Sequence, residues 1–295
     1  MIIFEERKGE IFIFFEALLW SLFPIVTILS LNTLSPITSL AWSTFFASIF
    51  FWITLYLKWN FREIKNKESL KDNLIGTFIL WILYYCLFFF GLRYTTAWNA
   101  SIIALSEIFF SFLFFNILKK KHLPVIHILW AIFTLSWAMI ILAPNFTHFK
   151  LGDLLVLLAA MVAPIWNHFM LKAREKVSSE NIMFIRSIIS TPILFIIWYL
   201  LNISLKISNF NSLLFLVINW FLLLGLSKIL WLESIKRISV VKAWSLSSIS
   251  PFFTLIIAWL VLDNIPNYNQ LFAIIPMFIG IILLSYTKKK KEILI

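Results

Sequence analysis

Two ionisable residues, Glu107 and Lys228, stand deep inside long apolar segments of the sequence. Glu107 lies about twelve residues into the segment 95–117, which is about 18 Å of helix at 1.5 Å per residue. Lys228 lies at a similar depth in the segment 213–235. A charge near the centre of a bilayer is costly and therefore tends to face a cavity or a partner. We predict that Lys228 binds the carboxylate of a solute, and that Glu107 binds an ammonium group or a coupling proton.

Two structural alternatives fit the same residues. Glu107 and Lys228 could form a mutual buried ion pair, or Lys228 could extend its aliphatic stem toward the membrane surface. Neutral substitutions separate these alternatives from solute binding. If Glu107→Gln and Lys228→Met both leave uptake of every transported compound unchanged, the binding hypothesis is wrong.

Further candidates are uncharged. Asn99 could donate hydrogen bonds to a solute, although polar side chains in membrane helices also bond neighbouring helices. Trp98, Tyr84, Trp166 and Trp244 lie at depths that suit the wall of a solute cavity, where they could stack on an aromatic or cationic group. Packing against lipid is the alternative, because the chain contains 32 Phe and 14 Trp throughout.

Two more charges lie closer to the ends of apolar segments. Glu16 is about a turn inside its segment, and we expect it to meet cations of nearby loops. Arg186 lies about a turn beyond Asn181, and we expect its guanidinium to reach the membrane surface along its stem. A role for Arg186 in gating is the alternative.

Ten apolar segments must position these residues. The chain is 61% hydrophobic and 13% charged, whereas soluble domains average about 25% charged residues. Each segment is about 20 residues long, which lets an α-helix cross about 30 Å of hydrocarbon. We therefore predict an all-α polytopic membrane protein with ten transmembrane helices, over residues 12–30, 36–57, 74–92, 95–117, 123–142, 153–172, 182–201, 213–235, 239–262 and 269–287.

The positive charges predict the orientation of the chain. Twenty Lys and Arg residues lie in the N-terminal tail and in every second connection, and only Arg93, Lys150 and Lys206 lie in the others. This bias indicates that both termini face the cytoplasm, in the plasma (inner) membrane. The net charge of +11 then reflects orientation and contact with anionic lipid. We predict no nucleic-acid binding, because no basic soluble domain or recognition motif is present.

The sequence also contains a weak internal repeat, which divides it into residues 1–145 and 146–295. Adding 143 to the number of Arg93 gives the number of Lys236, and this repeat offset also pairs Ala100 with Ala243. Arg93 lies on the charge-poor side and Lys236 on the charge-rich side, and five spans per repeat is an odd number. The second five-helix repeat should therefore be inverted relative to the first. Inverted repeats are typical of secondary carriers, which bind substrate near the midplane of the membrane.

The order and spacing of several segments resemble the EamA-type members of the drug/metabolite transporter (DMT) superfamily. The resemblance covers about residues 12–287 and implies a ten-helix carrier made of two inverted five-helix repeats. It is carried by ALLWSLFPI (17–25), GLRYTTAWNASIIALSE (91–107), LGDLLVLLAAMVAPIWN (151–167), ESIKRISVVKAWSLSSISPFF (233–253) and MFIGIILL (277–284).

The resemblance implies a secondary transporter that moves a small organic metabolite by alternating access. An amino acid or related zwitterion is the expected substrate, and the protein would act as an exporter or an exchanger. Proton coupling and a monomeric or homodimeric state are left open, and no cofactor or metal is expected. The competing hypothesis is a membrane protein that does not transport, either an embedded enzyme or an assembly subunit. We predict no enzyme, because the acyltransferase-like spacing of His148 and Asp153 lies on the charge-poor side, away from cytoplasmic acyl donors.

Overall fold

The computed structural model describes residues 2–58, 61–119, 150–204, 207, 210–238 and 240–265, together with 268, 271–272, 275 and 279. Every regular element in these ranges is a helix, which confirms the predicted all-α class there. The predicted span 123–142 lies outside the described residues, and the span 269–287 lies almost entirely outside them.

Six helical stretches within the described residues are long and apolar enough to cross a membrane. Two further apolar segments are shorter: residues Ala97–Ser111, which begin a longer helix, and Ser250–Leu262. The α-helices of the described residues are α1 (Ile2–Leu31), α2 (Pro36–Leu57), α3 (Lys67–Thr77), α4 (Tyr85–Arg93), α5 (Ala97–Lys119), α7 (Leu151–Arg174), α8 (Ser179–Leu200), α9 (Phe210–Ile218), α10 (Ser227–Ile235), α11 (Val240–Ser247) and α12 (Ser250–Leu262).

Two of the helical stretches contain a π-helical segment. Phe78–Tyr84 joins α3 to α4, and Asn219–Leu226 joins α9 to α10. The repeat offset places the first segment over most of the second. The wider turn rotates the residues that follow it, and such segments are frequent at functional sites. Lys228 is the second residue of α10, two positions after the end of the second segment.

The helix starts repeat in the same way. Ser35 precedes α2 and its Oγ accepts the backbone N–H of Thr38 at 3.1 Å. Ser178 precedes α8 and accepts the N–H of Asn181 at 3.3 Å. A serine in this position satisfies one of the unpaired N–H groups of the first turn. The repeat offset also separates these two caps, so corresponding helices begin at corresponding residues.

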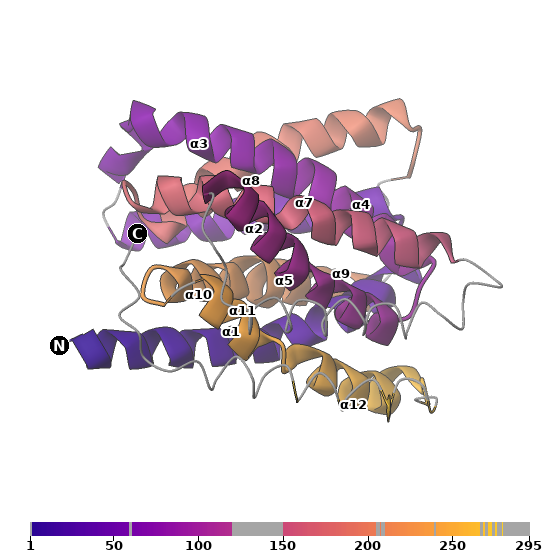
Figure 1. The fold of residues 1–295 in the computed structure, drawn as a ribbon. Helices are drawn as coiled ribbons and strands as arrows, with labels where there is room; N and C mark the ends of the chain where they lie inside the picture. Colours follow the sequence, from indigo (N-terminus) through magenta and orange to yellow (C-terminus); the bar gives the residue numbers. More distant parts are fainter. Residues whose placement is uncertain are drawn as a thin grey trace.

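The same offset also relates two close contacts between the halves, one made by Gly9 and the other by Gly152. Helices α1 and α7 run in opposite directions (Figure 1). A Cβ atom on Gly9 of α1 would lie 3.0 Å from Cγ2 of Ile238, and one on Gly152 of α7 would lie 2.7 Å from N of Thr95. Adding 143 to 9 gives 152, and adding 143 to 95 gives 238. Each half therefore offers its first helix to the same place in the other half.

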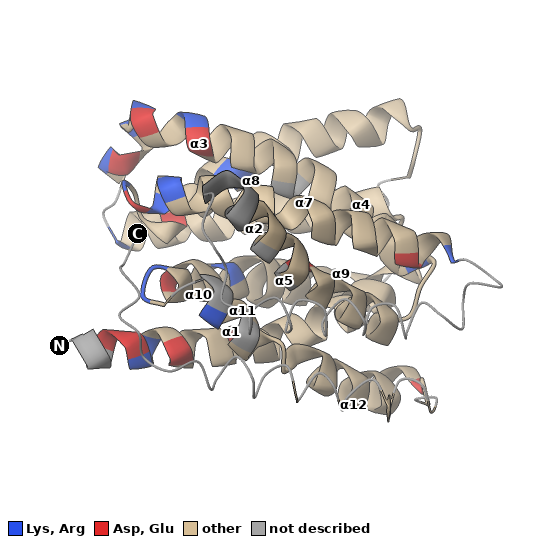
Figure 2. Cartoon of the chain, in the orientation of Figure 1, with Lys and Arg blue, Asp and Glu red and all other residues tan. Residues whose placement is uncertain are grey.

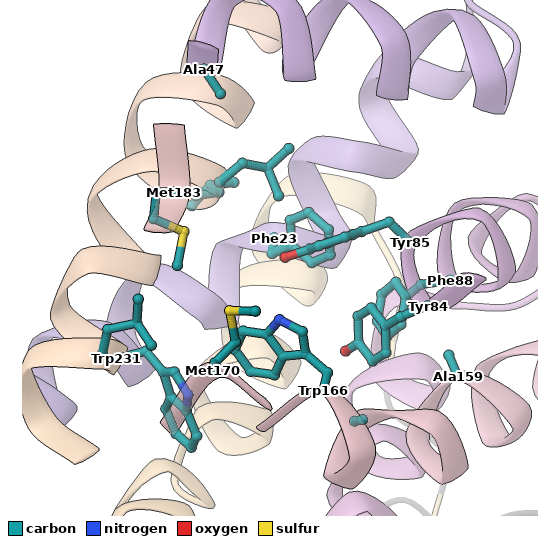
Figure 3. Packing of buried hydrophobic residues seen from close by; sticks show 14 of the residues in the cluster. Phe23, Ala47, Tyr84, Tyr85, Phe88, Ala159, Trp166, Met170, Met183 and Trp231 are labelled. Carbon is teal, nitrogen blue, oxygen red and sulfur yellow. The ribbon is translucent and has the colours of Figure 1, made fainter. Parts of the chain in front are cut away.

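The buried side chains between these helices are largely aromatic. Phe23 of α1 packs on Tyr85 and Phe88 of α4, with ring centroids 6.0 and 5.5 Å apart. Trp166 and Met170 of α7 lie close to this group (Figure 3). Charged residues instead gather mainly at the end of the bundle where α1 begins (Figure 2).

Candidate functional site

A buried ion pair joins the two halves near the middle of the bundle. Lys228 Nζ lies 3.7 Å from Glu16 Oε1, and the side chains are 10% and 3% exposed. The same ammonium lies 3.4 Å from the centroid of the Trp20 ring. The expectation that Glu16 meets loop cations is therefore wrong. Packing of α1 against α10 turns its carboxylate toward the interior instead.

Hydroxyl groups from two helices hold the Glu16 carboxylate. Ser227 Oγ donates to Oε1 at 3.4 Å, and Ser247 Oγ donates to Oε2 at 3.2 Å. Ser227 is the first residue of α10, and Ser247 is the last residue of α11. Both donors therefore lie where a regular helix begins or ends.

Glu107 belongs to a neighbouring series of side-chain hydrogen bonds. Asn167 Nδ2 donates to Glu107 Oε1 at 3.0 Å, and Trp231 Nε1 donates to Asn167 Oδ1 at 3.3 Å. The Trp231 ring packs on Trp244, with centroids 4.5 Å apart. These hydrogen bonds connect α5 of the first half to α7 and α10 of the second half.

The structure brings Glu107 and Lys228 together without pairing them. The hydrogen bonds of Glu107 lead through Asn167 to Trp231, which lies one helical turn from Lys228 on α10. The ion pair within 4 Å is nevertheless the one between Lys228 and Glu16. Among the described residues, no cation lies within that distance of Glu107. The two structural alternatives, a mutual pair and a Lys228 side chain that reaches the surface, are both wrong.

The aromatic candidates differ in position. Tyr84, Trp98 and Trp166 are buried, so lipid packing does not explain them. Tyr84 stacks on Phe88 and points toward Trp166 (Figure 3). Trp244 is half-buried beside Trp231. Whether these rings contact a solute remains a prediction.

Asn99 lies apart from the ion pair. It is buried near the start of α5, where its backbone N–H donates to Thr96 Oγ1 at 3.2 Å. Eight residues separate it from Glu107, which is about 12 Å along a helix. A direct contact of one small solute group with both side chains is therefore excluded.

Arg186 is the largest fully buried side chain in the described part of the chain. The expectation that it reaches the membrane surface is wrong. Every residue of α8 from Ser179 to Ser187 is buried, so the guanidinium is enclosed at this level of the bundle. Arg186 therefore adds a second buried basic side chain to the interior of the bundle.

Ion pairs gather at the end of the bundle where α1 begins, and those of Glu5 and Lys58 join the two halves. Arg174 Nη2 donates to Glu233 Oε1 at 2.6 Å, and Arg237 donates both to Glu233 and to Glu5. Burial disfavours the charge on Arg237, but the hydrogen bonds to Glu233 and Glu5 outweigh it and raise the pKa of the guanidinium. Lys58, directly after α2, pairs with Glu180 of α8 in the same region.

Contacts at the opposite end are mostly between uncharged groups. The hydroxyls of Thr33 and Ser212 are 2.5 Å apart, and Thr38 Oγ1 donates to the Ser204 carbonyl at 2.9 Å. Asp153 is buried and accepts a hydrogen bond from Thr95 of the other half. His148, the other member of the acyltransferase-like spacing, lies outside the described residues. Asp153 thus has a structural partner in the interface between the halves.

Comparisons with known proteins agree with this arrangement. The family model described as the EamA-like transporter family matches residues 7–143 and 150–286. The two matches have equal length, and the repeat offset separates their first residues. A solved structure, titled only as the crystal structure of a protein, matches 95% of this chain and 96% of its own. Its TM-score is 0.73 at 18% sequence identity, so it supports the fold alone. No curated protein matches the sequence significantly.

Proposed function

Because the chain belongs to the EamA-like transporter family, we propose that it moves a small organic solute across a membrane by alternating access. Its six long apolar helices, counted over the described residues, and its two family repeats make it a multi-pass membrane protein of the drug/metabolite transporter type. The family consists of transporters, which argues against the embedded enzyme and the assembly subunit as alternatives.

The full architecture that we propose has ten spans in two inverted repeats, residues 1–145 and 146–295. The exchanged contacts of Gly9 and Gly152 support the inversion, because they relate the halves by a two-fold operation. The uneven distribution of Lys and Arg supports cytoplasmic termini and a position in the plasma membrane. Reporter fusions at the two termini test this orientation, and a terminus on the outer side would contradict it.

An amino acid or related zwitterion is the substrate that the buried charges favour. The observation that carries this proposal is a buried cluster between the halves, in which the Glu16–Lys228 pair lies beside the hydrogen-bonded network of Glu107. Such a cluster can receive both ends of a zwitterion, since opposite charges stabilise each other strongly in a poorly hydrated interior.

Within this proposal, Lys228 binds the solute carboxylate and Glu107 binds the ammonium group or a coupling proton. Side chains around the cluster or along the same helices complete the proposed binding set: Tyr84, Trp98, Asn99, Trp166 and Trp244. Asn99 would contact the far end of a longer solute. Export and exchange both fit, as do a monomer and a homodimer.

Reconstitution tests the proposal directly. Purified protein in liposomes should accelerate uptake of radiolabelled L-amino acids, measured one at a time, relative to protein-free vesicles. Glu107→Gln and Lys228→Met should abolish this uptake, whereas Glu68→Gln, at an exposed position, should not. The absence of flux for every amino acid would refute the substrate class. The absence of flux for a wider panel of metabolites would favour the non-transporting alternative.

A further inference from the structure

The two members of the buried ion pair are held unequally. Each oxygen of Glu16 accepts a hydrogen bond from a neutral hydroxyl, from Ser227 at 3.4 Å and Ser247 at 3.2 Å. Lys228 Nζ lies 3.7 Å from Glu16, which is longer than a hydrogen bond, and it otherwise covers the face of Trp20. An ammonium group has three N–H donors. The carboxylate therefore has two hydroxyl donors besides Lys228, whereas the ammonium can still turn toward a closer acceptor.

Burial makes a counter-ion of Lys228 necessary. A buried charge without a partner is strongly unfavourable, and removal of one member of a buried pair leaves such a charge behind. Glu16 meets this need in the structure, where both side chains are at least nine-tenths buried. A solute carboxylate at Lys228 would meet the same need. Two carboxylates beside one ammonium would also repel each other, so Glu16 and the solute compete.

We propose that Glu16 is the internal counter-ion of the empty transporter, and that the carboxylate of an anionic or zwitterionic solute replaces it at Lys228. This inference rests on the proposed transport function, and it explains how the empty protein reorients to its starting state after the solute has left. The loaded protein reorients with the solute carboxylate beside Lys228. The empty protein reorients with Glu16 there, while Ser227 and Ser247 keep the Glu16 carboxylate hydrogen-bonded in either state.

The location of the pair suits this exchange. Glu16 comes from α1 of the first half, and Lys228 follows the π-helical segment of the second half. Ser247 lies at the junction between α11 and α12. Relative movement of the halves, or a change in the π-helical turn, would alter the distance between the two charges directly.

The Glu16→Gln variant distinguishes reorientation of the solute-loaded protein from reorientation of the empty protein. Vesicles preloaded with an unlabelled L-amino acid report exchange of the same amino acid in radiolabelled form, and vesicles loaded with buffer report its net uptake. We expect Glu16→Gln to lower net uptake about tenfold more than it lowers exchange, a difference equivalent to about 1.4 kcal/mol. Glu10→Gln is the matched control on α1, because its partner Lys242 also pairs with Glu6 at 2.6 Å. It should change neither flux.

The flux results separate two failures. Equal loss of exchange and net uptake in Glu16→Gln, or no loss in either, would overturn the counter-ion role. The absence of both fluxes in wild type would instead refute the proposed transport of amino acids.

A binding test needs no transport at all. Glu16→Ala removes a group the size of acetate, so acetate should bind beside Lys228 in that variant. We expect acetate at ten times its dissociation constant to raise the apparent Tm of Glu16→Ala by about 2–4 °C. Acetamide, the neutral isostere, should have no effect. Acetate should also leave wild type and the double variant Glu16→Ala/Lys228→Met unchanged.

An acetate effect that is absent in Glu16→Ala, or equal in all three proteins, would overturn the proposal. If Glu16→Ala folds poorly, its yield after gel filtration replaces Tm as the readout. Acetate should then raise the yield and acetamide should not, and equal yields with the two compounds would likewise overturn it.

Discussion

The two halves of the chain are alike at their ends and different in the middle. Gly9 meets Ile238 as Gly152 meets Thr95, and Ser35 caps α2 as Ser178 caps α8. At the centre, the repeat offset relates Glu16 to Ala159, Lys228 to Tyr85 and Arg186 to Ser43. The contacts that set the geometry are repeated, whereas the charges occur once.

This difference indicates how the two kinds of position are constrained. A two-fold frame needs the same close approach of helices in both halves, so small residues recur there. Under the proposed function, a single solute with unlike ends needs unlike partners, which would explain why the charged positions lose the repeat. Four predictions test this division, in order of decreasing effect.

Removal of Lys228 should have the largest effect on stability. Lys228→Met leaves Glu16 buried without its counter-ion, at a cost of about 3–5 kcal/mol, which thermal unfolding in detergent measures. The double variant Glu16→Gln/Lys228→Met should recover most of this loss, because no unpaired charge remains. A double variant as unstable as the single one would mean that packing, and not charge, explains the loss.

Asn167 should come next, because it serves two partners. Asn167→Leu removes the hydrogen bonds to Glu107 and Trp231 and should destabilise the protein by about 2–3 kcal/mol. The corresponding position in the first half is Pro24, which has no such role. Pro24→Ala is therefore the comparison, and an equally large loss for it would contradict the asymmetry. Denaturation by heat, followed by gel filtration, gives both values.

Alanine at either glycine contact should destabilise the protein, but the loss should be larger at Gly152 than at Gly9. Gly152→Ala places a Cβ 2.5 to 2.7 Å from backbone atoms of Gly91, Tyr94 and Thr95, which cannot move aside. We expect a loss of about 1–3 kcal/mol by the same unfolding assay. Gly9→Ala meets side-chain atoms at 3.0 Å and should cost less. A larger loss for Gly9→Ala would contradict this ranking.

The exposed ion pair at the charged end should matter least. Lys176 and Glu68 lie 3.4 Å apart, and the Glu68 side chain is 80% exposed. Glu68→Gln should shift the apparent Tm by less than about 1 °C, because solvent screens such pairs. The shift should fall further in 0.5 M NaCl, whereas that of Lys228→Met should not. Salt-independent loss in Glu68→Gln would contradict this reading.

Membership of the family, the all-helical class and the repeat offset could be predicted from sequence. The bilayer explains why, since it requires long apolar helices and leaves their boundaries visible in the residues. Glu107 and Lys228 could be selected for the same reason, because charge is rare at that depth. Glu16 gave no such signal, since it lies close to the charged start of α1.

The sequence by itself determined which residues are apolar, where the positive charges lie and which positions repeat. Tertiary structure decided that Lys228 meets Glu16 and not Glu107, and that Arg186 is enclosed and not exposed. The reason is physical. Glu16 and Lys228 come from different halves, and the π-helical turn before Lys228 leaves no mark in hydropathy, so only the packing of α1 on α10 fixes their distance.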